Sequence, residues 1–233
     1  MQNKKVLRKS GWLYIIWDYL QYVLIFIILY IVAGHFNFIR VWILLLIMII
    51  HSTILLIVLY KLNPELLNQR GEGQRDSKRW DVVISGLYFI FALYVTLTIA
   101  FLDIGRFHWS YISMSFAIVG IVILIFGWII SDWAMVVNVH FEKFVRIQTD
   151  RNHKIVDSGP YKYIRHPGYA AGVFWYLSVP VILGSMYAYI PALIGVCFLI
   201  IRTYLEDTTL QKELPGYTEY IQKVKYRIIP HIW

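Results

Sequence analysis

Two polar clusters in an otherwise apolar sequence contain the residue types that could carry out chemistry. The first is residues 153–169, HKIVDSGPYKYIRHPGY, which combines basic, aromatic and turn-forming residues. The second is Arg202-x-x-x-Glu206-Asp207, in which Arg202 and Glu206 share one helix face because they lie four residues apart. A guanidinium can bind a carboxylate through two hydrogen bonds, and a carboxylate can pair with a cation or accept a proton. We predict that the two clusters meet at the membrane surface and form one site.

The end of the first cluster predicts the start of a helix that attracts an anion. Proline is favoured at the first helical position, where its missing N–H costs nothing, so Pro167 begins a helix and His166 precedes it. Free N–H groups and the positive end of the helix dipole attract anions such as a ligand carboxylate, and Lys162 and Arg165 add positive charge. Taken singly, each residue could instead be an interface anchor. Their concentration within a few turns favours a site.

Membrane-spanning helices must position these clusters. Of the 233 residues, 59% are apolar and 15% are charged, whereas about 25% are charged in a typical soluble domain. Apolar blocks of about 20 residues are long enough to cross a hydrocarbon core of ~30 Å. The predicted fold is therefore all-α, a polytopic transmembrane bundle of about six spans. The expected spans are residues 12–32, 41–60, 82–102, 112–134, 169–183 and 188–204.

The segments between and after the spans are expected to be mostly irregular. Residues 61–81 are predicted to be a polar loop, and the fourth span to continue into an amphipathic stretch through Phe144. The fifth span is short, contains Pro180, and could form a tight hairpin with the sixth around Gly184. Residues 206–233 are predicted to form a polar tail with one helix, which could fold back as a lid or lie on the surface.

The basic residues fix the expected orientation. With the N-terminus in the cytoplasm and six spans, 20 of the 22 Lys and Arg residues face the cytoplasm, as the positive-inside rule requires. Both termini and both polar clusters then lie on the cytoplasmic side, and only Arg40 and Arg106 lie on the other. The cytoplasmic residues are Lys4, Lys5, Arg8, Lys9, Lys61, Arg70, Arg75, Lys78, Arg79, Lys143, Arg146, Arg151, Lys154, Lys162, Arg165, Arg202, Lys212, Lys223, Lys225 and Arg227.

Composition also weighs against other functions. The net charge of +8 does not indicate nucleic-acid binding, because most basic residues flank apolar spans. Cys197 is the single cysteine, so neither an intrachain disulfide nor a cysteine metal site is possible. Asp18, His51 and Asp132 are too scattered for an ion path. A lone histidine such as His51 is usually a hydrogen-bonded packing residue, and Asp132 could line a cavity at the end of the fourth span.

The motifs GPYKYIRHPGY, then R-x-x-x-E-D-x-x-L, then GYTEYIQKVKYRIIP resemble those of the isoprenylcysteine carboxyl methyltransferase family and its relatives, the phospholipid N-methyltransferases. The resemblance covers residues 138–230 and is looser before them. It implies residues 1–137 as an N-terminal part with four spans and residues 138–233 as the catalytic region. It also implies S-adenosylmethionine bound on the cytoplasmic side and a lipid-like or prenylated acceptor, with a carboxylate favoured, entering from the bilayer.

The resemblance further implies the roles of individual residues. Arg202 would bind the acceptor and Glu206 would act in catalysis and hold the cofactor; no metal is implied. The implied cofactor contacts are Gln148, His153, Lys154, Ile155, Val156, Tyr161, His166, Pro167, Gly168, Tyr169 and Glu206. Three alternatives stay open: methylation of an amine acceptor with Glu206 as base, an NADPH-dependent membrane reductase of the sterol reductase type, and a non-catalytic scaffold or channel. The sequence leaves the oligomeric state open.

Overall fold

The computed structural model describes residues 6–73 and 76–233, so Lys4, Lys5 and Arg75 of the charge analysis lie outside the described residues. The described residues are helical and contain no β-strand, as predicted. The α-helices are α1 (Lys9–Ala33), α2 (Ile39–Leu62), α3 (Pro64–Gly71), α4 (Arg79–Phe89), α5 (Thr96–Phe101), α6 (Met114–Val137), α7 (Pro167–Leu183), α8 (Tyr189–Glu213) and α9 (Tyr217–Lys223).

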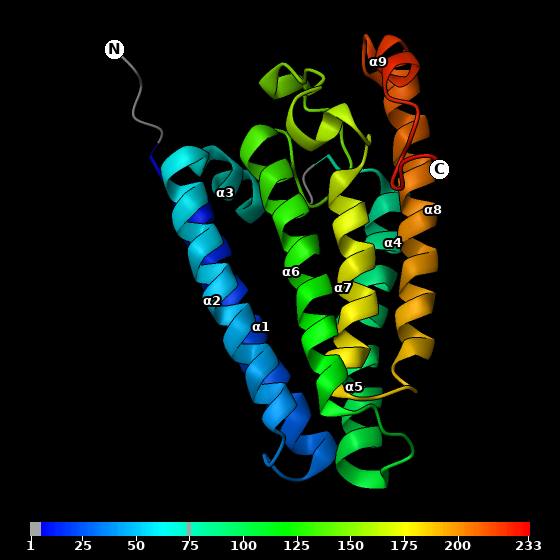
Figure 1. Cartoon of the computed structure of the whole chain (residues 1–233). Helices are drawn as coiled ribbons and strands as arrows, with labels where there is room; N and C mark the ends of the chain where they lie inside the picture. Colours follow the sequence, from blue (N-terminus) through cyan, green and yellow to red (C-terminus); the bar gives the residue numbers. More distant parts are fainter. Residues whose placement is uncertain (1–5, 74–75) are drawn as a thin grey trace.

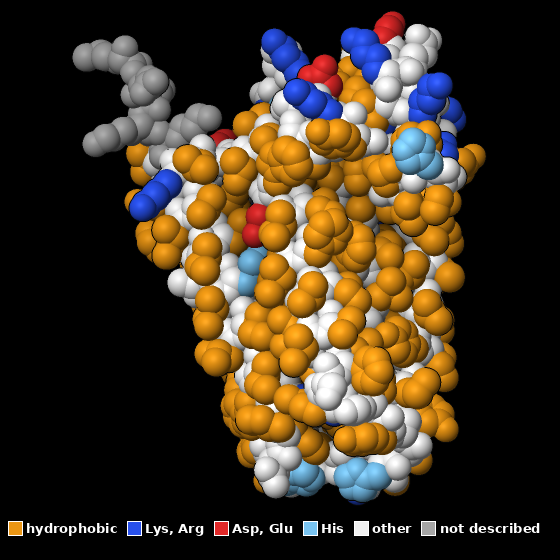
Figure 2. Space-filling model, viewed as in Figure 1, with side chains coloured by type: hydrophobic (Ala, Val, Ile, Leu, Met, Phe, Trp, Pro, Cys, Tyr) orange, Lys and Arg blue, Asp and Glu red, His pale blue; other side chains and the backbone are white. Residues whose placement is uncertain are grey.

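The long helices lie side by side and form the membrane-spanning bundle (Figure 1). The π-helical segments Ile90–Val95 and Leu102–Phe107 join α4 and α5 into one rod. Five helices are long and apolar enough to span a membrane: α1, α2, the rod Arg79–Phe107, α6 and α8. With 17 residues, α7 is about 26 Å long, which is slightly less than the hydrocarbon core. Figure 2 shows the apolar flank, so the protein is an integral membrane protein.

Three boundaries differ from the predictions. The polar loop 61–81 contains a helix, α3, which starts at Pro64 in the favoured first position. The fourth span ends at Val137 and the amphipathic stretch that follows it is not helical, because the Asn138 side chain accepts the His140 N–H and donates to the Tyr161 hydroxyl. The sixth span continues to Glu213, beyond the predicted end at residue 204.

Helices α6 and α7 pack closely because α6 presents glycines to α7. A Cβ atom at Gly120 would lie 2.7 Å from Ile182, and one at Gly127 would lie 2.8 Å from Phe174. Either distance is too short for a side chain, so the glycines permit the close approach. Helix α7 then turns into α8 at Gly184, whose φ of +91° suits glycine. The expected hairpin between the fifth and sixth spans is therefore confirmed.

The first polar cluster and the tail lie together at one end of the bundle. The loop between α6 and α7 folds over the start of α7, and α9 lies beside it above the end of α8 (Figure 1). Lys and Arg side chains gather at this same end (Figure 2). The polar clusters that are separated in sequence are thus adjacent in space.

Candidate active site

A cavity of about 260 Å³ lies at this end of the bundle, between the loop after α6, the start of α7, the end of α8 and the tail. Every residue that the sequence assigned to a cofactor or acceptor lines it, although the residues come from three separate stretches. These residues are Gln148, His153, Lys154, Ile155, Val156, Tyr161, His166, Pro167, Gly168, Tyr169, Arg202 and Glu206. The structure therefore brings the whole predicted set together.

The loop after α6 is held in shape by hydrogen bonds among its own polar side chains. Gln148 is buried; its Oε1 lies 2.8 Å from Nδ1 of His140, and its Nε2 donates to the His140 carbonyl at 2.9 Å. Asn138 donates to the Tyr161 hydroxyl at 2.8 Å, which ties the start of the loop to its end. Arg146 binds Glu142 through Nε at 2.8 Å. This wall of the cavity is therefore ordered by polar contacts.

His140 and His153 face each other in this wall, with ring centroids 4.5 Å apart. Burial, together with the nearby His140, Arg146 and Arg151, lowers the pKa of His153 to about 4. Burial also lowers the pKa of His140, although its contact with Gln148 opposes this. Both rings are therefore neutral at pH 7, and this side of the cavity presents uncharged imidazoles to a ligand.

The start of α7 is arranged as the proline placement predicted. His166 precedes the helix, and Pro167 is its first residue. The N–H groups of Tyr169 and Ala170 turn back to the His166 carbonyl, at 3.1 and 3.2 Å. The Gly168 N–H has no hydrogen-bond partner among the described residues and lies at the cavity wall. At the helix start, the groups available to bind an anion are therefore this N–H and the positive end of the helix dipole.

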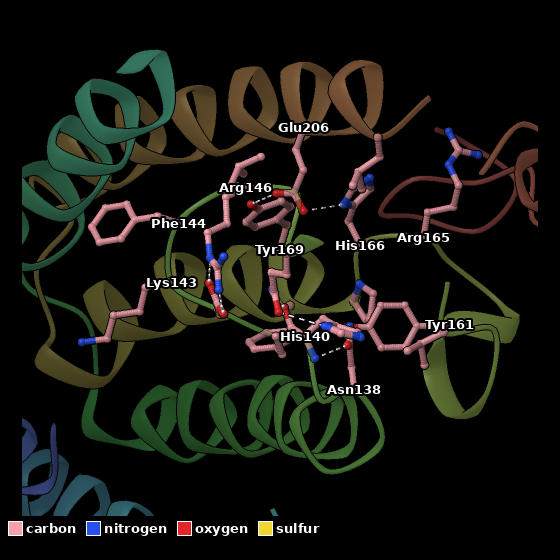
Figure 3. Close-up of a pocket in the computed structure, with 18 of the residues that line it drawn as sticks. Asn138, His140, Lys143, Phe144, Arg146, Tyr161, Arg165, His166, Tyr169 and Glu206 are labelled. Atoms are coloured by element: carbon pink, nitrogen blue, oxygen red, sulfur yellow. Dashed lines mark hydrogen bonds and ion pairs between the residues drawn. The ribbon is translucent and has the colours of Figure 1, made fainter. Parts of the chain in front are cut away.

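Glu206 projects from α8 into the cavity and contacts the start of α7 (Figure 3). One carboxylate oxygen accepts a short hydrogen bond from the Tyr169 hydroxyl. The other oxygen lies 3.9 Å from Nδ1 of His166. Neither a lysine nor an arginine forms a salt bridge with Glu206 among the described residues. Glu206 is therefore a carboxylate that is free to pair with a cationic ligand.

Arg202 has a partner that the sequence analysis did not identify. Its Nε and Nη2 donate to the two carboxylate oxygens of the fully buried Asp81, at 2.7 and 3.2 Å, and Nη2 also donates to the Lys143 carbonyl. The helix salt bridge with Glu206 that the i, i+4 spacing allowed is replaced by this pair. Nη1 of Arg202 has no partner among the described residues, so it remains available at the cavity wall.

Asp207 fixes the tail over the cavity. Its side chain is fully buried and accepts from Nε and Nη2 of Arg165, at 2.8 and 2.9 Å. It also accepts from Nε of Arg227 at 2.9 Å and from the Tyr217 hydroxyl at 2.9 Å. Because Tyr217 also lines the cavity, the tail forms a lid, which was one of the two predicted arrangements.

Asp132 does not line this cavity, contrary to one expectation. Its Oδ2 lies 2.9 Å from Nε2 of His51, and the His51 ring stacks on Trp128 with centroids 3.9 Å apart. His51 is thus the hydrogen-bonded packing residue that was predicted. Asp132 is turned toward α2 by this contact, and its neighbours Ser131 and Met135 face the cavity instead.

Several residues that shape the cavity were missed. Asp81 is sixty-odd positions before the loop and more than a hundred before Arg202, so no local pattern could pair them. Arg70 and Lys143 were treated only as cytoplasmic charges, although both line the cavity. Asn138 and His140 could have been found from the sequence. They directly follow the apolar block that ends at residue 137, and polar residues that follow a span lie at the same membrane surface as the site.

The comparisons with known proteins agree with this arrangement. Residues 118–212 match the model of the isoprenylcysteine carboxyl methyltransferase (ICMT) family. Over these residues the chain is similar to the ICMT family. The matched range includes most of α6, all of α7, most of α8 and the loop between α6 and α7, which together supply most of the cavity wall. The resemblance inferred from the motifs is therefore confirmed.

Two relatives and one solved structure with ICMT-related names are also similar to this chain. Two proteins described as a probable protein-S-isoprenylcysteine O-methyltransferase, from Oryza sativa subsp. indica and subsp. japonica, are 28% identical over 131 residues, or 54% of this chain. The match spans 66% of their length. A solved structure of the eukaryotic intramembrane Ras methyltransferase ICMT covers 80% of this chain with a TM-score of 0.52 and 21% identity, and 64% of that chain is matched. The last comparison supports the ICMT fold.

Proposed function

We propose that this protein is an integral membrane methyltransferase that uses S-adenosylmethionine to methylate the carboxylate of a prenylated cysteine. The observation that carries the proposal is the gathering of the twelve predicted residues around one cavity. The match of residues 118–212 to the ICMT family supports the reaction, and the names of the rice relatives supply the acceptor class. Residues 138–233 would form the catalytic region, and the helices of residues 1–137 would complete the acceptor side.

In this proposal, the cavity faces the cytoplasm. The positive-inside pattern supports this orientation, because the described cytoplasmic Lys and Arg residues of the sequence analysis belong to the end of the bundle that holds the cavity. The only exceptions in the sequence are Arg40, in the first turn of α2, and Arg106, in the last turn of the rod, both at the opposite end.

The residues present suit S-adenosylmethionine, which carries a carboxylate, an ammonium and an adenine. The Gly168 N–H at the start of α7 would bind the carboxylate. Glu206 has no Lys or Arg partner among the described residues and would pair with the ammonium. Ile155, Leu214 and the neutral His153 ring offer an apolar surface for the adenine. When bound, the cofactor supplies an electrophilic methyl group.

The reaction needs positioning more than acid–base chemistry. A carboxylate acceptor is already ionised at neutral pH, so no residue of this chain has to remove a proton from it. Nη1 of Arg202 is available to orient one acceptor oxygen, and Asp81 holds the guanidinium in place. The tail covers one side of the cavity, and exclusion of water on ligand binding would strengthen these interactions. An amine acceptor would instead require Glu206 as a base.

Thermal unfolding of the purified protein tests cofactor binding. We expect millimolar S-adenosylmethionine to raise the Tm of the wild type and of Glu213→Gln, because Glu213 is an exposed carboxylate on the same helix. Glu206→Gln should lose the shift. Transfer of a radiolabelled methyl group to an S-prenylcysteine acid then tests the reaction, and Arg202→Ala should keep the Tm shift while losing turnover. An unchanged wild-type Tm at millimolar cofactor would contradict the proposal.

Competition between cofactors separates this function from the reductase alternative. NADPH should neither raise the Tm nor displace bound S-adenosylmethionine. Binding of NADPH in the same cavity, with no binding of S-adenosylmethionine, would favour the reductase.

A further inference from the structure

The cavity has a second, cationic end formed by Arg70 of α3 and Lys143 of the loop after α6. Figure 3 shows the Lys143 side chain pointing away from Glu206 and His166, so it leaves the part of the cavity assigned to the cofactor. Both side chains lie against one face of α1: the Arg70 guanidinium is 5.4 Å and the Lys143 ammonium 4.6 Å from the centre of the Tyr14 ring. The two positive charges therefore share one small region.

These charges lack a close carboxylate among the described residues. Nη1 of Arg70 has only weak contacts, with the Met135 sulfur at 3.7 Å and the Phe141 carbonyl at 3.4 Å. Its Nε is buried without any hydrogen-bond partner. Lys143 makes no hydrogen bond or ion pair through its ammonium in the described structure. Asp18 interacts electrostatically with both charges but forms a salt bridge with neither among the described residues. A buried donor without a partner is costly, so it indicates a site for a ligand.

The other arginines at the cavity wall are different. Arg146 is paired with Glu142, Arg165 with Asp207, and Arg202 with Asp81. Their charges are compensated within the protein, and Arg202 can therefore donate a hydrogen bond without adding net positive charge. Among the described arginines that line the cavity, only Arg70 has no carboxylate within salt-bridge distance.

The pKa of Lys143 agrees with this view. Burial and the neighbouring Arg70 lower the pKa of Lys143 to about 8, although Asp18 opposes the change. The protein by itself thus disfavours the second positive charge. An anion bound between Lys143 and Arg70 would restore the positive charge of Lys143.

The surroundings of the pair are apolar. Met135 and Phe141 line the cavity beside Arg70 and belong to the same hydrophobic cluster as Leu56 and Leu67. The buried members of this cluster come from α2, α3 and α6. A ligand that fits must therefore combine an anionic head with an apolar body.

We propose that Arg70 and Lys143 bind the carboxylate of the methyl acceptor, with its apolar chain against Met135 and Phe141, which line the cavity. This inference rests on the proposed function and identifies the residues that select an acid as the acceptor. Methylation forms a bond between the transferred methyl carbon and a carboxylate oxygen as the methyl leaves the sulfonium sulfur, and the ester product is neutral. The cationic pair therefore attracts the acid and releases the ester.

Kinetics on the full-length protein in detergent test the proposal. An N-acylated S-prenylcysteine acid is the acceptor, and Arg70→Gln and Lys143→Gln are compared with the wild type. Lys61→Gln is the control, since Lys61 is an exposed cation at the end of α2. We expect KM for the acid to rise by ~10- to 100-fold in each cavity variant, from the loss of a hydrogen bond to a charged group. kcat, the affinity for S-adenosylmethionine and the kinetics of Lys61→Gln should stay close to wild type.

A binding comparison separates failure of this inference from failure of the proposed function. Competition by the acid and by its uncharged carboxamide is measured against a fluorescent prenyl probe, which needs no turnover. The wild type should prefer the acid, Arg70→Gln and Lys143→Gln should lose the preference, and Arg70→Lys and Lys143→Arg should keep most of it. An acid preference that is unchanged in both Gln variants would overturn the inference even if the enzyme is active. A wild type that shows the preference but transfers no methyl group would keep Arg70 and Lys143 as the binding site of a prenylated acid and overturn the proposed function.

Discussion

Replacing Asp207 by asparagine should detach the tail from the cavity. The Asp207 side chain is fully buried and is bonded to Arg165, whose side chain is 5% exposed, and to Arg227 and Tyr217. The asparagine would keep the shape of the side chain but remove the negative charge, so the Arg165 charge would be buried without compensation. Breaking a buried ion pair in this way costs about 3–5 kcal/mol. The apolar contacts of Leu214, Tyr217, Tyr220 and Val224 remain.

The cost should appear as local opening, because Arg165 Nη1 also holds the Val224 and Lys225 carbonyls at 2.8 Å. A loss of ~3 kcal/mol or more corresponds to at least ~100-fold more tail in the open state. Hydrogen exchange of the amides in residues 217–228 measures this population directly. The affinity for S-adenosylmethionine should fall in parallel, because the open tail no longer closes the cavity.

Asp150→Asn is the matched control. Asp150 also binds an arginine, Arg146, at 2.7 Å, but its side chain is 58% exposed, so its loss should not change exchange in the tail. If Asp207→Asn left the protection of residues 217–228 at the wild-type level, the tail would be held by its apolar contacts alone. The role assigned to Asp207 would then be wrong.

Three further predictions follow from the packing and the charges. A Cβ at Gly71 would lie 1.9 Å from the Ser10 carbonyl oxygen, so Gly71→Ala should lower the Tm. Gly86 faces open space, so Gly86→Ala is the control and should leave the Tm unchanged. Equal Tm values for the two variants would contradict the packing of α1 on α3. The pKa of His153 is lowered to about 4, mainly by burial, so the stability of the wild type should fall as the pH drops from ~6.5 toward 4. In thermal unfolding, His153→Phe should reduce this dependence of Tm on pH. The same dependence in the variant and the wild type would show that the ring is solvated. The pKa of Lys143 is about 8, so KM for an acid acceptor should rise as pH increases through 8 and the ammonium loses its proton; the same rise in Lys143→Gln would assign it to another group.

Local patterns predicted the features that depend on near neighbours in the sequence. Apolar blocks of helix-spanning length identified the membrane helices, because a backbone in lipid must satisfy its own hydrogen bonds. Pro167 located the start of α7 because a proline is accepted there at no cost in hydrogen bonding. The fourth span was predicted to end at about residue 134, and α6 ends at Val137. The contact of the next residue, Asn138, with Tyr161 could not be predicted, because the two residues are 23 positions apart.

By itself, the sequence determined an all-helical membrane protein, the position of most helices, and twelve of the residues that line the cavity. The motif resemblance contributed that set, and the fold brought its three stretches together. Only the tertiary structure decided which charges are already paired. Asp81 compensates Arg202 across 121 positions, Asp207 compensates Arg165 across 42, and Arg70 and Lys143 have no such partner among the described residues. The physical reason is that spacing along a helix determines which residues share a face, whereas the charge of a site depends on helices that meet from distant parts of the chain.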